Sequence, residues 1–541
     1  MLICSAWPYA NNVPHLGTLI GCLLSGDVFA RYYKLKGHEV VHVSGTDAHG
    51  TRMEFEALQR GITPQQLVEQ VHQQIVETLH KFDIFLENYT ITRSPTHQRF
   101  VHEIYKKMEA NGYIFTKDEE RAYCQNCKKF LADSFIVGTC PRCKYDRAYG
   151  DQCSQCGAIL EAEQLINPQC QICKQSNIVF RRTRNWYLDL PKLEPKLREY
   201  VSAHQDWAPN VKNFTDGLLK EGLKPRAVTR DLSWGIPAPF AGAENKVIYV
   251  WAEAALGYVS ATIEYFEKRG EPERWRDFWF GDNVKQVYTQ GKDNITFHTL
   301  IFPGQLLASG EGYHLPDQIS ATEHLQWIGK QRFSKSQKIG LFSDDALELM
   351  NPLYWRFYLL YNRPERKDIE FSWEDVDNAV NGVFINNISN LLNRIVSLAH
   401  RSYGGVYPEA NVYPEIFKEI KAVKEEYESI IEGGQLAGAL RRVCDLAVLG
   451  NEYVQRNRPW EGHKPEVMLT ALQVVKAVTI LLEPFVPAFS RRAYPILGVK
   501  APSFDDVLKI ETGVKLGPPE VLLQKIEIKA LRERYKQMKA A

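Results

Sequence analysis

The sequence predicts an α/β protein whose parallel sheet is interrupted by a cysteine-rich insertion and followed by a small mixed segment and an all-α region. Three observations support this fold class. Buried strand-like runs lead into helical patterns on both sides of the insertion, four CxxC pairs fall within one stretch, and helical periodicity continues over the late part of the chain. With 541 residues and 44% apolar composition, the chain is long enough for several domains with their own cores.

The first strand, helix and second strand form one unit that points to a ligand site. An apolar run at residues 2–6 leads through a loop to His15 and Gly17, where a helical pattern begins, and the next buried strand ends at Asp47. In an open parallel sheet, ligands bind beyond the carboxyl ends of the strands, and phosphates bind at helix N-termini. We therefore expect His15, Gly17 and Asp47 at a ligand-binding edge.

The insertion is marked by its cysteines, eight of which fall in CxxC pairs. Each pair places two thiolates on a tight turn, and two such turns complete a tetrahedral Cys₄ site for Zn²⁺. Eight thiolates predict two zinc ions with a structural role, because four protein ligands leave no position for substrate or water. Spacing alone does not decide which pairs share an ion. The pairs are Cys124/Cys127, Cys140/Cys143, Cys153/Cys156 and Cys170/Cys173.

After the insertion, strand-to-helix junctions at residues 247–258 and 284–294 predict further parallel strands, and apolar stripes from about residue 383 to 498 predict an α-helical bundle. The expected divisions are 1–117 and 227–325 for the two halves of the sheet domain, 118–226 for the insertion, 326–375 for a loop and the mixed segment, and 376–541 for the helical region with its terminal helix.

Charge and cysteine usage narrow the class of protein. Lys plus Arg number 66 against 65 for Asp plus Glu, so any contact with nucleic acid must come from a local patch. The most apolar late stretch is interrupted by Lys476 and Glu483, and the N-terminal sequence lacks the pattern of a secretion signal. CxxC pairs suit thiolate ligation in a reducing compartment. We expect a cytoplasmic protein that is not associated with a membrane.

Two segments far apart in the chain carry a family resemblance. HLGT at residues 15–18 and RFSKS at residues 332–336 resemble the HIGH and KMSKS signatures of class I aminoacyl-tRNA synthetases, and the residues between them are similar to the methionyl-tRNA synthetase family. The resemblance implies a Rossmann-like catalytic domain, a connective zinc-binding insertion, a stem-contact segment and an anticodon-binding bundle. The departures are typical of the archaeal and eukaryotic branch: Thr18, Arg332, Phe333, Ala255, Asn294 and Phe302.

The resemblance also implies a reaction. Methionine and MgATP would form methionyl-adenylate, and the methionyl group would pass to the 3′-terminal adenosine of initiator and elongator tRNA(Met). His15 and Lys335 would be catalytic and contact ATP, as would Gly17, Thr18, Arg230 and Ser334. The implied methionine site is Ala6, Trp7, Tyr9, Asp47, Trp251, Ala254, Tyr258 and His298. Aromatic walls suit a soft thioether, and a buried carboxylate suits an ammonium group.

For the bundle, the resemblance implies that Asn390, Arg394 and Trp460 read the anticodon. For the insertion, it implies a nested arrangement, in which Cys140/Cys143 share one zinc with Cys153/Cys156, and Cys124/Cys127 share the other with Cys170/Cys173. The sequence shows no appended oligonucleotide-binding domain of the kind some relatives carry. We therefore expect a monomer, or a chain that recruits a separate tRNA-binding protein.

Two alternatives stay open at this point. A class I synthetase for leucine, isoleucine or valine would usually carry an editing domain too large for the cysteine-rich insertion. A non-catalytic tRNA-binding zinc scaffold would form no adenylate with any amino acid, although intact His15, Asp47 and Lys335 argue against it. Methionine-dependent ATP–pyrophosphate exchange discriminates between these possibilities.

Overall fold

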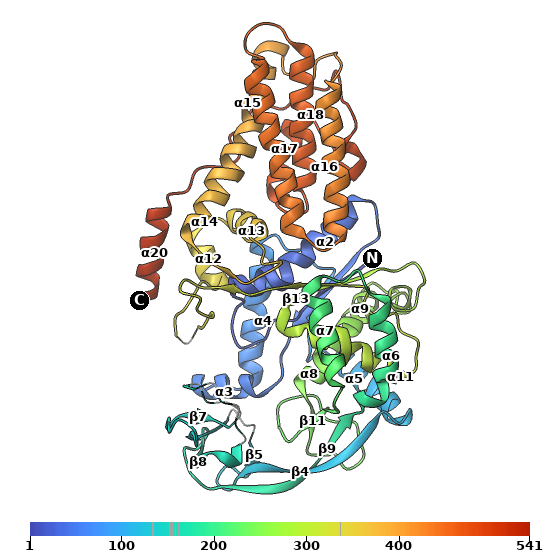
Figure 1. The fold of residues 1–541 in the computed structure, drawn as a ribbon, viewed down its shortest axis with the longest axis vertical. Coiled ribbons are helices and arrows are strands. Elements are labelled where there is room, and N and C mark those ends of the chain that lie inside the picture. The colour runs from blue at the N-terminus through green and yellow to red at the C-terminus, as the bar shows by residue number, and fades with distance from the viewer. Residues whose placement is uncertain are drawn as a thin grey trace.

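The computed structural model describes residues 1–540 except 132–134, 151, 152, 154, 157, 159, 161 and 336. Along the longest axis of the molecule, a helical bundle occupies one end, the main sheet with its helices lies in the middle, and the small sheets of the insertion form the other end (Figure 1). The cysteine-rich insertion and the helical bundle thus project from opposite sides of the sheet domain.

A five-stranded parallel sheet in the order β14-β13-β1-β2-β3 forms the centre of the molecule. In β1, Leu2 lies opposite Val41 on one side and Gln286 on the other. The strands before and after the insertion therefore join in one sheet, as predicted, and the strand order reverses at β1, where open α/β sheets bind ligands. The strands are β1 (Leu2–Ser5), β2 (Val41–Thr46), β3 (Asn88–Ile91), β13 (Gln286–Gly291) and β14 (Gln318–Thr322).

Helices cover this sheet and begin where the sequence supplies caps. At the start of α4, Thr63 Oγ1 accepts a hydrogen bond from the Gln66 N–H, and the Gln66 side chain accepts one from the Thr63 N–H, which together form a capping box. The helix after β1 runs without a break through α1, the π-helical η1 and α2. The helices are α1 (Leu16–Thr18), η1 (Leu19–Leu24), α2 (Ser25–Leu35), α3 (Thr51–Arg60), α4 (Pro64–Lys81), α5 (Pro95–Ala110), α9 (Gly257–Lys268), α10 (Arg276–Trp279) and α11 (Phe302–Ser309).

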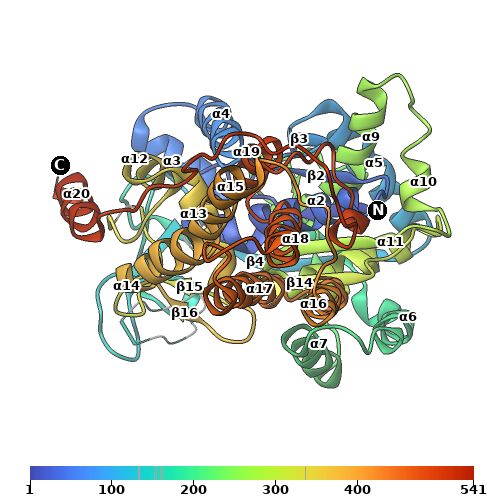
Figure 2. The same ribbon diagram turned by 90° about the horizontal axis from the view of Figure 1, so that it is seen from above.

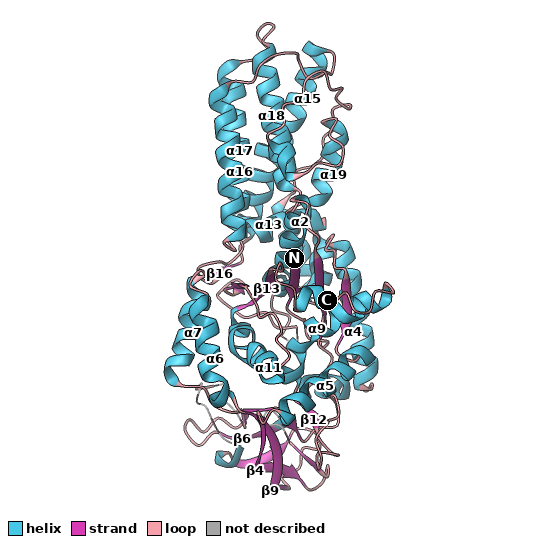
Figure 3. Cartoon of the chain, turned by 90° about the vertical axis from the view of Figure 1, so that its right-hand side faces the viewer, coloured by secondary structure: helices cyan, strands magenta, loops and turns pink. Residues whose placement is uncertain are grey.

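The insertion is a long antiparallel ribbon with a small three-stranded sheet at its far end. Strands β4 and β9 pair along eleven residues each, from Ile114 opposite Leu188 to Cys124 opposite Ile178, and so carry the cysteines away from the main sheet (Figure 3). Its elements are β4 (Ile114–Cys124), β5 (Lys129–Phe130), β6 (Ile136–Thr139), β7 (Ala148–Tyr149), η3 (Ala162–Gln164), β8 (Ile166–Cys170), β9 (Ile178–Leu188), α6 (Leu190–Ala203), α7 (Pro209–Glu221) and β10 (Arg226–Ala227).

The segment at residues 247–250 differs from the expectation of a further parallel strand. Only Val247 and Ile248 pair, antiparallel to β11, and the chain then turns directly into α8. The two strands form a small sheet of their own, separate from the main sheet. This part of the chain comprises β11 (Thr229–Arg230), β12 (Val247–Ile248), α8 (Val250–Glu253), η4 (Ala254–Leu256), η5 (Lys292–Asn294) and η6 (Phe297–Ile301).

The bundle follows a short parallel pair of strands and the helices that lead out of the sheet domain. In the view from above, α15, α16, α17 and α18 are seen nearly end-on, whereas the C-terminal helix α20 lies apart from them (Figure 2). The elements are β15 (Leu325–Gln326), α12 (Ser343–Leu349), α13 (Pro352–Tyr361), β16 (Ile369–Glu370), α14 (Trp373–Asp377), η7 (Asn378–Ser389), α15 (Asn390–Tyr403), α16 (Pro414–Glu432), α17 (Leu436–Asn457), α18 (Pro465–Leu482), α19 (Pro487–Ile496), η8 (Phe504–Val507) and α20 (Ile528–Ala540).

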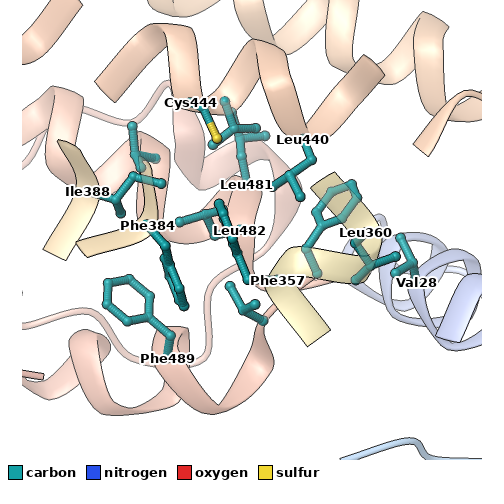
Figure 4. Packing of buried hydrophobic residues seen from close by; sticks show 14 of the residues in the cluster. Val28, Phe357, Leu360, Phe384, Ile388, Leu440, Cys444, Leu481, Leu482 and Phe489 are labelled. Carbon is teal, nitrogen blue, oxygen red and sulfur yellow. The ribbon is translucent and has the colours of Figure 1, made fainter. Parts of the chain in front are cut away.

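One continuous apolar core joins the bundle to the sheet domain. Phe357 of α13 stacks on Phe384 with ring centroids 4.3 Å apart, and Val28 of α2 belongs to the same cluster (Figure 4). Helix α18 has the length and composition of a membrane-spanning helix, but 89% of that window is buried inside the bundle. It is therefore the central core helix of the bundle.

A buried arginine fixes the joint between the two regions. Arg356 of α13 is 1% exposed, and its guanidinium donates hydrogen bonds to the backbone oxygens of Phe82, Asp83 and Pro484 at 3.1 to 3.2 Å. It also pairs with the buried Asp27 carboxylate of α2. Because a buried charge that loses its partner is costly, this network holds α13 in one position against the sheet domain.

Candidate active site

A cavity of about 820 Å³ opens beyond the carboxyl ends of β1, β2 and β13. This size is within the range of small-molecule sites. The loop after β1, the start of the following helix, the α8–α9 region, η6 and the RFSKS loop all contribute to its wall. Thirteen of the predicted site residues line it: Ala6, Trp7, Tyr9, His15, Gly17, Thr18, Asp47, Trp251, Ala254, Tyr258, His298, Ser334 and Lys335. Ser336 of the RFSKS segment lies outside the described residues.

At one end of the cavity, His15 is oriented by Thr18. The Thr18 N–H donates to His15 Nδ1 at 3.2 Å, which leaves the proton of the neutral imidazole on Nε2, 3.2 Å from Thr18 Oγ1. Burial, with a smaller effect from His324, lowers the pKa of His15 to about 4. A side chain at Gly17 would lie 3.0 Å from the His15 ring. His15 is thus a neutral donor that is held by the Thr18 N–H and packs closely on Gly17.

The RFSKS loop lies directly against His15. Phe333 stacks on the His15 ring with centroids 4.6 Å apart and planes 3° from parallel. The backbone after the loop pairs with the first signature, because the Leu16 N–H donates to Leu341 O at 3.2 Å. Lys335 Nζ binds Asp344 Oδ2 at 2.6 Å. The two signatures therefore form one end of the same cavity, and Lys335 is held at its edge by a carboxylate.

The other end of the cavity has aromatic walls. Trp251 lies between Tyr9 and Phe297, with ring centroids 6.2 and 4.7 Å away. Tyr258 donates its hydroxyl proton to His298 Nε2 at 2.8 Å, while His298 Nδ1 donates to the Asn294 backbone oxygen at 2.9 Å. Burial lowers the pKa of His298 to about 4, consistent with this neutral form. The result is a preformed apolar chamber with one polar end.

Asp47 is buried beside this chamber and has a carboxylate neighbour. The loop after β1 fixes its backbone, since the Asp47 N–H donates to Pro8 O and the Ala10 N–H donates to Asp47 O. Burial and the charge of Glu253 raise the pKa of Asp47 well above its usual value. A bound cation would relieve both effects.

Sequence reasoning missed the cluster behind Asp47. The carboxylate of Glu253, which is fully buried, is bonded to His49 Nδ1 and to His97 Nε2, both at 2.7 Å. Although burial raises the pKa of Glu253, these two histidines lower it below its usual value. The His49 N–H in turn lies 3.4 Å from Asp47 Oδ1. The signal available in the sequence was weak, because Glu253 resembles an ordinary polar residue beside Trp251.

Arg230 is the one predicted ATP contact that does not line this cavity. It lies in a neighbouring cavity of about 590 Å³, with its guanidinium 4.1 Å from the centroid of the Tyr249 ring. Burial lowers the pKa of Arg230. The two cavities share four wall residues: Tyr9, Arg52, Trp251 and Asp293.

The cysteines form two groups of four in the nested arrangement. Within each group the sulfur atoms all lie within 4.8 Å of one another, and the closest pairs are 3.6 to 3.9 Å apart. Tetrahedral Zn–S bonds require a separation of about 3.8 Å, far longer than a disulfide bond. Lys128, Lys144 and Lys174, each directly after a CxxC pair, have positive φ, as tight turns require. Both groups fit one tetrahedral ion each. The groups are Cys124, Cys127, Cys170 and Cys173, and Cys140, Cys143, Cys153 and Cys156.

The three residues expected to read an anticodon lie on the bundle. Asn390 and Arg394 are on α15, and Arg394 donates a hydrogen bond to Asn451 of α17 at 3.0 Å. Trp460 follows α17 in the turn before α18, and its side chain is 43% exposed. The structure thus brings α15 and α17 together, and leaves an indole exposed beyond the end of α17.

Two known protein families match this chain. Residues 1–396 match the family described as tRNA synthetases class I (M), and residues 404–540 match the anticodon-binding domain of methionyl-tRNA ligase. This chain belongs to the methionyl-tRNA synthetase family. The predicted family is therefore confirmed, and with it the divided sheet, the cysteine insertion and the helical anticodon-binding domain.

Individual methionyl-tRNA synthetases are similar to this chain over almost its whole length. Methionine–tRNA ligase of Caldivirga maquilingensis is 44% identical, with 99% of this chain and 93% of the relative covered, and that of Thermofilum pendens is 44% identical over 100% and 98%. The crystal structure of Mycobacterium tuberculosis methionyl-tRNA synthetase bound by methionyl-adenylate has a TM-score of 0.78 at 19% identity, covering 96% of this chain and 99% of that one. At that identity the likeness establishes the fold.

Proposed function

We propose that this chain activates methionine with ATP to methionyl-adenylate and transfers the methionyl group to the 3′-terminal adenosine of tRNA(Met), for initiation and elongation of translation. The observation that carries the proposal is the shared cavity. Both signature segments meet at one end of it, and an aromatic chamber with a buried carboxylate forms the other. A nucleotide site and an apolar amino-acid site are thus continuous.

In the first step, Asp47 would bind the methionine ammonium and the chamber around Trp251 would bind the thioether side chain. The ammonium would neutralise a carboxylate that burial and Glu253 otherwise disfavour. The unbranched, polarisable thioether suits aromatic walls better than the branched side chains of leucine, isoleucine or valine. The Tyr258–His298 pair closes the polar end of the chamber.

A methionine carboxylate oxygen would then attack the α-phosphorus of ATP, forming the acyl-phosphate bond as the bond to pyrophosphate breaks. His15 Nε2–H would donate to the α-phosphate, and Lys335 would leave Asp344 to pair with the departing pyrophosphate, whose charge Mg²⁺ shares. Positioning and charge stabilisation of this kind carry displacements at phosphorus. In the second step, the terminal ribose 2′-OH would attack the acyl carbon and release AMP.

The two cysteine groups would each hold one Zn²⁺ with a structural role, because all four ligand positions are filled by protein. Cysteines that stay available as thiolates require reducing conditions, which supports a cytoplasmic location. Metal analysis should find two zinc ions per chain, and fewer than two would contradict this assignment.

The bundle would read the CAU anticodon. An exposed indole such as Trp460 is suited to stacking on an unpaired base, and Asn390 and Arg394 offer donors and acceptors four residues apart on one helix. Trp460→Ala should lower the rate of aminoacylation of tRNA(Met) and leave amino-acid activation unchanged.

Methionine-dependent ATP–pyrophosphate exchange tests the proposal as a whole. We expect exchange with methionine and much slower exchange with leucine, isoleucine and valine under the same conditions. Exchange with one of those three in preference to methionine would identify a different class I synthetase. The lack of exchange with every amino acid would favour the non-catalytic tRNA-binding scaffold.

A further inference from the structure

The C-terminal helix α20 is docked beside the RFSKS loop and not on the bundle. Figures 1 and 2 both show it next to α12 and α14. Two ion pairs anchor it, with Arg532 Nη1 3.1 Å from Glu374 Oε1 of α14 and Lys539 Nζ 2.6 Å from Asp345 Oδ2 of α12. Asp345 directly follows Asp344, the partner of Lys335. Helix α20 is therefore held next to the residues that position the loop lysine.

One side chain of α20 contacts both ends of the loop. The Tyr535 ring lies 5.3 Å from the ring of Trp327, which precedes the loop, and 5.9 Å from that of Trp373. Tyr535 also lies beside the backbone of Gly340 at the far end of the loop, which partly offsets the burial that raises the pKa of Tyr535 to about 12. Trp327 and Trp373 are both buried, so Tyr535 packs against fixed surfaces. Tyr535 thus packs beside both ends of the loop, although it lies far away in the sequence.

The same contacts continue to His15. Gly340 has a φ of +93°, and any side chain there would collide with the Phe333 ring, so Phe333 packs directly on the Gly340 backbone. Phe333 also lies 6.0 Å from the Trp327 ring and stacks on His15. A continuous set of ring contacts therefore runs from Tyr535 through Trp327 and Phe333 to the imidazole.

We propose that Tyr535 is a positioning residue for the adenylate-forming reaction, and that α20 supports the RFSKS loop so that Phe333 stays stacked on His15 and Lys335 stays at the edge of the cavity. The kinetic part of this inference rests on the proposed function. The structural part, support of the loop by α20, does not depend on it. Trp251, Tyr258 and the rest of the amino-acid chamber lie outside this set of contacts, so methionine binding is unaffected.

The test compares full-length Tyr535→Ala and Tyr535→Phe with wild type, and with Arg534→Ala as a matched control. Arg534 is exposed on the same helix. Tyr535→Ala should lower kcat/KM for ATP in ATP–pyrophosphate exchange by about tenfold, the effect of losing about two aromatic contacts. Tyr535→Phe keeps the ring contacts and should therefore stay within about twofold of wild type. Arg534→Ala should match wild type, and all three should keep the wild-type Kd for methionine.

A second measurement follows the loop itself. Limited trypsin digestion after Lys335 and Lys338 should be several-fold faster in Tyr535→Ala than in wild type or Arg534→Ala, at equal thermal stability. Unchanged digestion, or faster digestion with unchanged kcat/KM for ATP, would overturn the proposal. So would an equal loss of methionine affinity. If wild type shows no exchange, the proposed function fails, and the digestion pattern alone then decides whether α20 supports the loop.

Discussion

The two ends of the cavity are built in different ways. The amino-acid end consists of side chains within the core, where Asp47 and His298 are each 4% exposed and hydrogen-bonded to their neighbours. At the phosphate end, Lys335 is 34% exposed and its partner Asp344 is 50% exposed. Packed, hydrogen-bonded groups keep one geometry, whereas an exposed ion pair costs little to break. Under the proposed function, amino-acid selection would therefore depend on a preformed pocket, and phosphate chemistry would depend on a group that must change partners.

The largest effect should come from the buried end. Asp47→Asn keeps the size of the side chain but leaves the substrate ammonium without a counter-charge, which costs on the order of 4 kcal/mol in a buried site. We expect kcat/KM for methionine to fall about a thousandfold in ATP–pyrophosphate exchange. A loss below about threefold would show that the ammonium is bound elsewhere.

Lys335→Ala tests the exposed end. Removal of one group that stabilises the leaving pyrophosphate should lower the exchange kcat about a hundredfold while the Kd for methionine stays unchanged. Lys330→Ala is the matched control, because this exposed lysine lies five residues before Lys335 and does not line the cavity. An equal exchange kcat in the two variants would contradict the proposed role of Lys335.

The Glu253→Gln variant tests whether the buried contacts of Glu253 with two histidines support the pocket. The two histidine contacts weaken, so kcat/KM for methionine should fall about tenfold. Under the proposed function methionine binds to ionised Asp47, and loss of the Glu253 charge should lower the Asp47 pKa. The loss of activity on the acid side of the pH profile should therefore occur at lower pH in the variant than in wild type. A pH profile of kcat/KM for methionine checks this, and an acid limb shifted to higher pH would contradict it.

The smallest effect should come from Thr18→Val. The N–H to His15 Nδ1 bond remains, and only the contact of Oγ1 with Nε2 is lost, so kcat/KM for ATP should fall about threefold. Thr18→Ser keeps the hydroxyl and should behave as wild type. A loss in Thr18→Val as large as that of Lys335→Ala would mean that the hydroxyl itself contacts ATP.

Local patterns predicted much of this molecule because the relevant groups are close in sequence. The run from Leu2 to Asp47 forms the strand–helix–strand unit, and each CxxC pair is its own turn. The nested cysteine arrangement needed the family resemblance, since spacing alone left it open. In the structure, the β4–β9 ladder places Cys124 opposite Ile178, which brings the first CxxC pair next to the last one.

What the sequence did not reveal depends on contacts between distant segments. Glu253, His49 and His97 come from three separate segments of the chain, and each is an unremarkable polar residue by itself. The terminal helix was predicted, but nothing in its periodicity indicates that Tyr535 packs on Trp327 beside the RFSKS loop. Arg230 was grouped with the ATP contacts, and its position in the adjoining cavity follows from the short β11–β12 pair.

The helix runs without a break from α14 through η7 to α15, so a small tilt at its base causes a large displacement at its far end. It spans roughly 45 Å, so a tilt of about 5° at its base displaces its far end by about 4 Å, more than the length of a hydrogen bond. The base is packed on α13, whose Arg356 is bonded to Asp27 and to four backbone oxygens. The position of the far end of the bundle therefore depends on how rigidly Arg356 holds α13 against the sheet domain.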